Sequence, residues 1–165
     1  MNDSTAQSVR EFIEHETHLL NSERYDEWLA LLTPDFQYRM PMPVLRDDPA
    51  LPRHSERSLL AWESVASLTL RFERILTEFA WADRPPAFHR RHLTAIRVRA
   101  GDVAGTHAVA CDELVYRSRA PEGSSITSAL REDLVRIGDS GPRLAGRNVL
   151  IDVDRPDLAQ IALLY

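Results

Sequence analysis

The sequence contains no lysine and only one cysteine, Cys111. All 20 basic residues are therefore arginines, and 25 acidic residues outnumber them to give a formal net charge of −5. This balance leaves no broad basic face for phosphates, so nucleic acid is not expected as a partner. A single cysteine cannot form an internal disulfide, which agrees with a cytoplasmic protein.

Long apolar runs are also absent. No stretch approaches the roughly 18 apolar residues of a membrane-spanning helix. The first residues, MNDSTAQSVRE, lack the basic and apolar regions of a signal peptide. With 165 residues, 44% of them hydrophobic and 27% charged, the chain has the composition of one globular domain over residues 1–165. We expect a cytoplasmic domain without a membrane partner.

The N-terminal segment predicts a helix, a short helix and a strand. Apolar residues recur at helical spacing over 12–20 and again over 28–32, with a break at Asn21 and Ser22. Glu16 falls within the first apolar stripe. Residues 36–40 alternate between apolar and polar side chains, as in a strand.

A proline-rich loop and a long helical pattern follow. Residues 42–54 contain three prolines and the adjacent acids Asp47 and Asp48, so no regular element is expected there. Long loops in compact domains often carry function, and this one is interpreted as an arm onto a neighbouring molecule. Residues 58–79 show one apolar stripe at helical spacing, which predicts a helix that ends before Pro85.

From His89 onward the hydrophobic period changes from 3.6 to 2, which predicts strands. Short turn signals separate the predicted strands, so neighbouring strands should pair antiparallel. Helices first and an antiparallel sheet afterwards predict an α+β fold, with the helices packed on one face of a curved sheet. The four predicted strands are His89–Ala100, Thr106–Ser118, Ser124–Ile137 and Arg143–Val153.

Several motifs match one known family in order and spacing over about residues 10–165. They are Phe12, Glu16, Leu19-Leu20, Tyr25-Asp26, Trp28-Leu29, Tyr38 with Pro41, Trp81 with Pro85-Pro86, Arg90-Arg91-His92-Leu93, Tyr116–Arg119, Arg131–Leu134, Leu144–Arg147, Leu150–Asp152 and Asp157-Leu158. This pattern resembles the small (beta) subunit of aromatic-ring-hydroxylating dioxygenases, in the NTF2-like, cystatin-like class. The chain departs from the family at Asn21, where Asp is usual, and at Ala95, where Asn is usual.

The resemblance implies an NTF2-like cone and a non-catalytic role. Such a subunit forms homo-oligomers, with a trimer favoured, and stabilises a catalytic large subunit in the breakdown of aromatic hydrocarbons. The large subunit would hold the Rieske 2Fe-2S cluster and the non-haem iron, and this chain would hold no cofactor. Ligand counting agrees, because a Rieske cluster needs two cysteines and two histidines.

His15 and His18 raise the possibility of a metal site on the first helix. They stand three residues apart, with Glu14 and Glu16 in the same segment. The two glutamates point away from the face that the histidines share, and no spacing fixes a third ligand. We therefore expect no metal in this chain.

The alternative function is a stand-alone enzyme of the same fold, a cofactor-independent dehydratase, isomerase or cyclase. Its candidate acid–base groups are His92, His15, Tyr38 and Asp112.

The alternation of side chains between the two faces of a strand predicts which of these candidate residues face the cone. If Arg97 and Arg99 face water, then His92, Thr94, Ile96 and Val98 face the cone. The next strand leaves two possibilities open. Its inward residues are either His107, Val109, Cys111 and Glu113, or Ala110, Asp112 and Leu114.

Arginines crowd the predicted strands. They suit desolvated, bidentate pairing with carboxylates, and Glu132 and Asp133 are interleaved with them, so one interpretation is an ion-paired subunit face. The other interpretation is that the arginines reflect a bias in genomic composition. The arginines concerned are Arg90, Arg91, Arg117, Arg119, Arg131, Arg136, Arg143 and Arg147.

Overall fold

The computed structural model describes residues 3–76, 86–121 and 123–153 of the chain. Within these ranges the chain forms three helices and six strands. In chain order they are α1 (Asp3–Asn21), α2 (Tyr25–Ala30), β1 (Leu32–Pro43), β2 (His54–Ser64), α3 (Val65–Leu76), β3 (Phe88–Ala100), β4 (Thr106–Arg119), β5 (Gly123–Gly138) and β6 (Gly141–Ile151).

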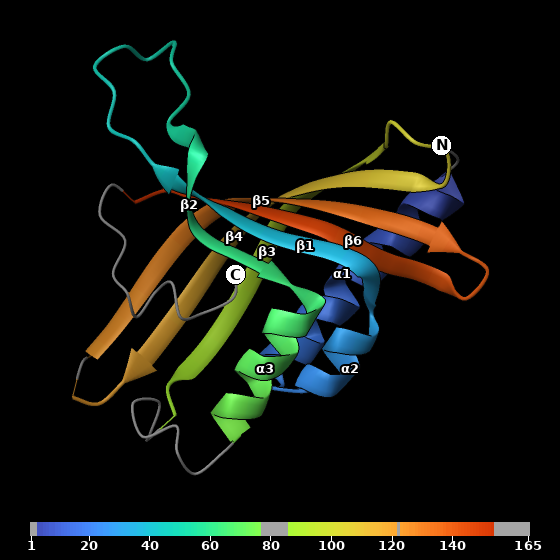
Figure 1. Ribbon diagram of the computed structural model, residues 1–165, viewed down its shortest axis with the longest axis horizontal. Helices are drawn as coiled ribbons and strands as arrows, with labels where there is room; N and C mark the ends of the chain where they lie inside the picture. The colour runs from blue at the N-terminus through green and yellow to red at the C-terminus, as the bar shows by residue number, and fades with distance from the viewer. Residues whose placement is uncertain (1–2, 77–85, 122, 154–165) are drawn as a thin grey trace.

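The strands form one mixed sheet in the order β2-β1-β6-β5-β4-β3. Neighbouring strands pair antiparallel except β1 and β6, which run parallel. The sheet curves over the three helices, which lie together on its inner face (Figure 1). The predicted α+β fold is confirmed, and so are the antiparallel pairings along β3, β4, β5 and β6.

The core lies between the helices and the inner face of the sheet. α1 contributes an apolar stripe that includes Phe12 and Ile13, both buried. Trp28 of α2 packs edge-on against Phe36 of β1 and Phe72 of α3, with ring centroids 6.2 and 5.9 Å apart. Aromatic edge-to-face contacts of this kind fix the relative positions of the elements that carry them. Across the described part of the chain, none of the helices combines the length and the apolar character needed to cross a membrane.

The predicted helix over 58–79 is wrong in its first part. Residues 58–64 belong to β2, which pairs antiparallel with β1 through contacts such as Arg39 with Trp62. The helix begins only after Ser64, whose Oγ accepts a hydrogen bond from the Ser67 backbone N–H at 3.3 Å. The Ser67 hydroxyl oxygen in turn accepts one from the Ser64 backbone N–H at 2.9 Å. This reciprocal cap is the start signal that apolar periodicity alone did not reveal.

A β-bulge interrupts β3. Between the register pairs Thr94–Asp112 and Arg97–Ala110, two residues of β3, including Ala95, face one residue of β4. Ala95 has a φ of +50°, in the left-handed region that favours glycine and asparagine. The extra residue reverses the inside–outside alternation of the strand at this point.

The bulge overturns one orientation predicted from alternation. Ile96 and Val98, after the bulge, are half-buried and pack against the core, as expected. Before the bulge, however, Arg91 is buried, and His92 and Thr94 are exposed on the outer face. The expectation that His92 and Thr94 face inward is therefore wrong, because strict alternation does not survive an inserted residue.

The structure also decides the open question on β4. Val109, Cys111 and Glu113 are buried on the inner face and His107 is half-buried, whereas Asp112 is exposed. The inner face of the cone thus receives a carboxylate from Glu113 and not from Asp112.

Candidate functional site

Ionisable side chains gather on the inner face of the sheet, under α1. Six of them are buried, three acidic and three basic, so their formal charges cancel. They are Glu16 of α1, Arg91 of β3, Glu113 of β4, Arg131 and Asp133 of β5 and Arg147 of β6. We call this set the buried network.

Two arginines and two carboxylates form the centre of the buried network. Arg147 donates from Nη2 to Glu16 Oε1 at 2.8 Å and from Nε to Asp133 Oδ1 at 2.8 Å. Arg131 donates from Nε to Asp133 Oδ2 at 2.8 Å and also pairs with Glu16. Each guanidinium therefore bridges the helix and the sheet through charge-assisted hydrogen bonds.

Trp28 completes the coordination of Glu16. Its indole Nε1–H donates to Glu16 Oε2 at 2.7 Å, while the Thr17 hydroxyl donates to Oε1 at 2.9 Å. Both carboxylate oxygens of Glu16 thus accept hydrogen bonds, as a buried charge requires.

Glu113 lies at the edge of the buried network. Its Oε1 is 3.6 Å from Nη1 of Arg131, and neither of its oxygens accepts a hydrogen bond from a described residue. Arg91 is a second cation that interacts with Glu113 electrostatically.

Glu16 and Arg131 remain charged at neutral pH. Burial by itself raises the pKa of Glu16, but Arg131, Arg147 and the Trp28 hydrogen bond outweigh it and lower the pKa to about 2. Burial also lowers the pKa of Arg131, yet Asp133, Glu16 and Glu113 together raise it well above its usual value. Groups held in one protonation state by their partners cannot exchange protons with a substrate near neutral pH. The network therefore has a structural role: it fills the interior of the cone in place of apolar side chains.

The structure does not bring the four predicted acid–base residues together. His92 and Asp112 are both exposed on the outer face of the sheet, where Asp112 pairs with Arg97 at 3.3 Å. His15 is exposed on α1, and Tyr38 is buried on the inner face of β1.

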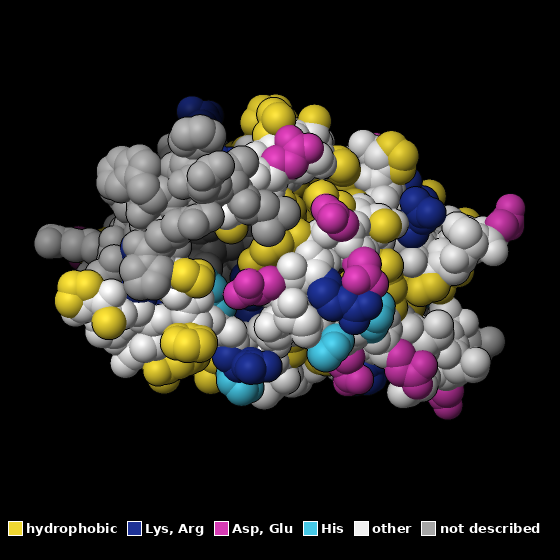
Figure 2. Space-filling model, turned by 90° about the horizontal axis from the view of Figure 1, so that it is seen from below, with side chains coloured by type: hydrophobic (Ala, Val, Ile, Leu, Met, Phe, Trp, Pro, Cys, Tyr) yellow, Lys and Arg dark blue, Asp and Glu magenta, His cyan; other side chains and the backbone are white. Residues whose placement is uncertain are grey.

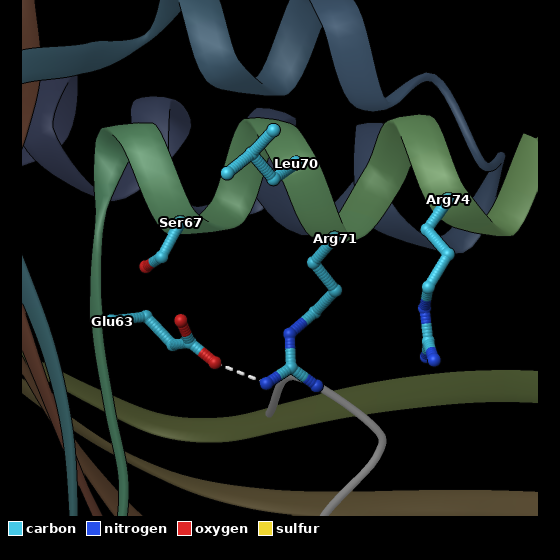
Figure 3. A pocket seen from close by; sticks show the side chains of 5 residues that line it. All are labelled: Glu63, Ser67, Leu70, Arg71 and Arg74. Atoms are coloured by element: carbon cyan, nitrogen blue, oxygen red, sulfur yellow. Dashed lines mark hydrogen bonds and ion pairs between the residues drawn. The ribbon is translucent and has the colours of Figure 1, made fainter.

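An open pocket of about 390 Å³ lies elsewhere, between β2 and α3. The side chains that line it are Glu63, Ser67, Leu70, Arg71 and Arg74 (Figure 3). Its carboxylate, Glu63, is ion-paired with Arg71, and the Ser67 hydroxyl donates to the Ser64 carbonyl at 3.1 Å. None of the four predicted acid–base residues is among the described side chains that line this pocket.

The metal-ligand chemistry of the described residues is limited. They contain no group of three or more histidine, cysteine, aspartate or glutamate side chains placed to hold a metal ion. Cys111 is buried, and burial raises the pKa of its thiol to about 12. This donor set does not fit a Rieske cluster or a mononuclear iron site.

One of the two interpretations of the strand arginines placed them on an ion-paired subunit face. That interpretation is wrong for Arg91, Arg131 and Arg147, and likewise for Asp133, because all four are buried between α1 and the sheet. Two features of the sequence could have indicated that these residues are buried. Glu16 stands within an apolar helical stripe, and Arg131 and Asp133 share their parity on β5 with buried apolar residues.

Seen from the helical side, the surface carries acidic, basic and histidine side chains interspersed with apolar ones (Figure 2). Among the acids exposed on α1 and α2 are Glu11, Glu14 and Asp26. No single sign of charge dominates this view, so no one ligand charge is favoured there.

A curved mixed sheet wrapped around an N-terminal helix defines an NTF2-like domain with a cystatin-like fold. An NTF2-like protein of cystatin-like fold from Novosphingobium aromaticivorans matches it with a TM-score of 0.60 at 15% identity, over 97% of this chain and 89% of that one. A chain of naphthalene 1,2-dioxygenase with indole bound in the active site gives a TM-score of 0.84 at 20% identity, over 99% of this chain and 87% of that one.

Comparison of the sequence with known families identifies the family of this chain. The model of the ring hydroxylating beta subunit family matches residues 15–155, and the chain belongs to this family. Benzene 1,2-dioxygenase subunit beta from Pseudomonas putida is 28% identical over 149 residues, which cover 87% of this chain and 80% of that protein. The resemblance recognised in the sequence is confirmed.

Proposed function

We propose that this chain is the non-catalytic small subunit of an aromatic-ring-hydroxylating dioxygenase and stabilises a catalytic large subunit. The observation that carries the proposal is the centre of the buried network, where the carboxylates of Glu16 and Asp133 and the guanidiniums of Arg131 and Arg147 bind one another. An enzyme that used the cone as an active site would need polar groups free to meet a substrate. Membership of the beta subunit family supports the same assignment.

The chemistry of the complex belongs to the large subunit in this proposal. That subunit would hold the Rieske 2Fe-2S cluster and the non-haem iron, which together supply electrons and activate oxygen for attack on an aromatic ring. The contribution of this chain is a rigid, ion-paired domain that supports the large subunit. The described residues contain no group of three or more metal-ligating side chains that would support a cofactor site in this chain.

The remaining parts of the proposal concern assembly and location. We place the chain, as a single domain, in a homo-trimer that binds large subunits in the cytoplasm and serves aromatic hydrocarbon breakdown. The lone, buried Cys111 suits a reducing compartment.

The test is reconstitution with the cognate large subunit. The two chains should co-purify, iron and acid-labile sulfide should follow the large subunit, and this chain alone should not turn over an aromatic substrate. His92→Gln, Tyr38→Phe and Asp112→Asn should each change turnover of the complex by less than about tenfold, because none of these residues meets a substrate.

The alternative, a stand-alone dehydratase, isomerase or cyclase, predicts the opposite result. Loss of a general acid or base would reduce turnover by roughly 10²–10⁴-fold with little change in thermal stability. Such a loss for any of the three variants, or failure of every large subunit to bind, would overturn the proposed function.

A further inference from the structure

Glu113, at the edge of the buried network, lacks the hydrogen bonds that a buried carboxylate needs. Its side chain is 0% exposed, and neither of its oxygens accepts a hydrogen bond from a described residue. Glu16, in contrast, accepts hydrogen bonds at both of its oxygens. A buried acceptor that loses its water and gains no donor destabilises the folded state, and the cost is larger when the acceptor is charged. Glu113 therefore requires a donor other than these side chains.

The missing partner of Glu113 is a donor and not a counter-charge. The buried network holds three acidic and three basic side chains, so its formal charges cancel. Arg131 Nη1 lies 3.6 Å from Glu113 Oε1, which is too far for a hydrogen bond, and donates instead to the Thr17 hydroxyl at 3.3 Å. A cation at Glu113 would be repelled by Arg131 and by Arg91, and an anion has no hydrogen to donate. The chemistry of the site thus calls for a neutral hydrogen-bond donor.

The side chains beside Glu113 are short. In the β4–β5 register Glu113 lies directly opposite Ala129, which is buried and shares its face of the sheet. Cys111, two residues earlier on β4, is buried on the same face and is also small. Leu93 lies opposite Glu113 on the other side, in the β3–β4 register. Short neighbours next to a buried, acceptor-only group suit a donor as small as water.

We propose that the interior of the cone binds a water molecule at Glu113, next to the methyl group of Ala129. The water donates to a carboxylate oxygen of Glu113 and accepts the second N–H of Arg131 Nη1, whose first N–H binds Thr17. An internal water held by two or more polar partners is an integral part of a folded protein. This inference goes beyond the proposed function and does not depend on it, because the water serves the packing of the domain.

A crystal structure of the full chain, at a resolution that shows ordered internal water, tests the proposal directly. The expected result is an electron-density peak about 2.6–3.0 Å from a carboxylate oxygen of Glu113. Hydrogen bonds from protein donors to both oxygens would overturn the proposal, and so would a site without density. Either failure would leave the proposed function unaffected, because that function is tested by binding of the large subunit.

Two variants of Ala129 give an independent measurement. Threonine and valine have nearly the same shape, so Ala129→Thr and Ala129→Val should both displace the water and disturb the packing equally. The threonine hydroxyl can donate to Glu113 in place of the water, whereas valine leaves the carboxylate without a donor. The equilibrium constant for folding, measured by urea denaturation, should therefore be at least about fivefold lower for Ala129→Val than for Ala129→Thr.

Ala108, which is exposed on β4, provides the control for this exchange. Ala108→Thr and Ala108→Val should differ by less than about threefold, because strand propensity alone distinguishes them there. An Ala129→Val variant as stable as Ala129→Thr would overturn the proposal, since it would show that Glu113 obtains its hydrogen bonds without the water. Should neither Ala129 variant fold, the crystal structure of the unchanged chain decides the question.

Discussion

Arg131 is the residue on which the interior of this protein depends most. Its guanidinium is fully buried and pairs with Glu16 and Asp133, and it lies 3.6 Å from Glu113. Removing one partner from a buried ion pair leaves uncompensated charge in a low dielectric, which costs about 3–5 kcal/mol. Arg131→Met should therefore reduce the free energy of unfolding by that amount, as measured by urea denaturation.

Arg136 provides the matched control on the same strand. It pairs with Asp35 at 3.0 Å, but both side chains are exposed to solvent. Exposed ion pairs are screened by water and contribute little. Arg136→Met should leave the denaturation midpoint close to that of the wild type, and equal losses for the two variants would contradict a special role for the buried network.

Glu16 should make the protein sensitive to acid in a defined range. Its pKa is lowered from 4.5 to about 2 in the folded state, so the unfolded chain binds a proton first as the pH falls. The resulting stabilisation, about 3 kcal/mol, is fully present above pH 4.5 and is lost as the pH falls toward 2. In Glu16→Gln, the free energy of unfolding should therefore depend less steeply on pH over this range.

His89 affects the free energy of unfolding at higher pH than Glu16 does. The two contributions must therefore be measured separately. Burial, with Arg91 and Arg117, lowers the pKa of His89 from 6.5 to about 4, so its contribution is lost between those values as the pH falls. The effect of Glu16 on the pH dependence of the free energy of unfolding is therefore best measured below pH 4. Glu14→Gln, on the exposed face of the same helix, should keep the wild-type slope. An unchanged slope for Glu16→Gln would show that the network does not hold this carboxylate ionised.

Among the elements, β3 is strained at one position. Ala95 adopts a φ of +50° at the bulge, a conformation that costs a residue with a Cβ roughly 1–2 kcal/mol. Ala95→Gly removes that cost but adds unfolded-state entropy, so we expect a net gain of about 0.5–1 kcal/mol in the free energy of unfolding. Ala95→Asn should also stabilise, which gives a physical reason for the asparagine usual in the family.

Ala108 on β4 is the control for this substitution. It is an exposed strand residue outside the described positions of positive φ. Ala108→Gly should destabilise by about 0.5–1 kcal/mol, because glycine in regular strand backbone loses more entropy on folding. A loss of stability at both positions would mean that the bulge conformation of Ala95 carries no strain.

The end of α1 shows how one side chain can close the edge of a sheet. The Asn21 amide donates to the Arg91 carbonyl at 3.0 Å, and the Arg91 N–H donates to the Asn21 Oδ1 at 2.8 Å. The side chain thus replaces a neighbouring strand at the β3 edge. The aspartate usual in the family could accept the second bond but could not donate the first.

At the scale of the whole molecule, the protein is expected to need no metal. The described residues provide no three-ligand group, and the Cys111 thiol is kept protonated by burial. Treatment of the purified chain with a chelator should leave its melting temperature and its oligomeric state unchanged. Stoichiometric iron or zinc that is retained through the chelator would contradict this prediction and direct attention to His15 and His18.

The sequence by itself determined the class and the family of this protein. Local signals sufficed for that: helical spacing at the N-terminus, the change of period at His89, and short turns that require antiparallel neighbours. Family motifs distributed over the whole chain added the beta subunit assignment. These features depend on residues close together in the chain, so they can be read without knowing which segments meet.

The tertiary structure decided several side-chain orientations that local patterns in the sequence did not. The parallel contact of β1 with β6 joins Tyr38 to Arg147, far apart in the sequence, and no local pattern announces it. The bulge at Ala95 turned His92 outward, because a single inserted residue reverses every orientation before it. Glu16 and Arg131 became an interior pair only when α1 packed across the sheet. Long-range packing thus fixed which of the charges lie in the interior of the protein.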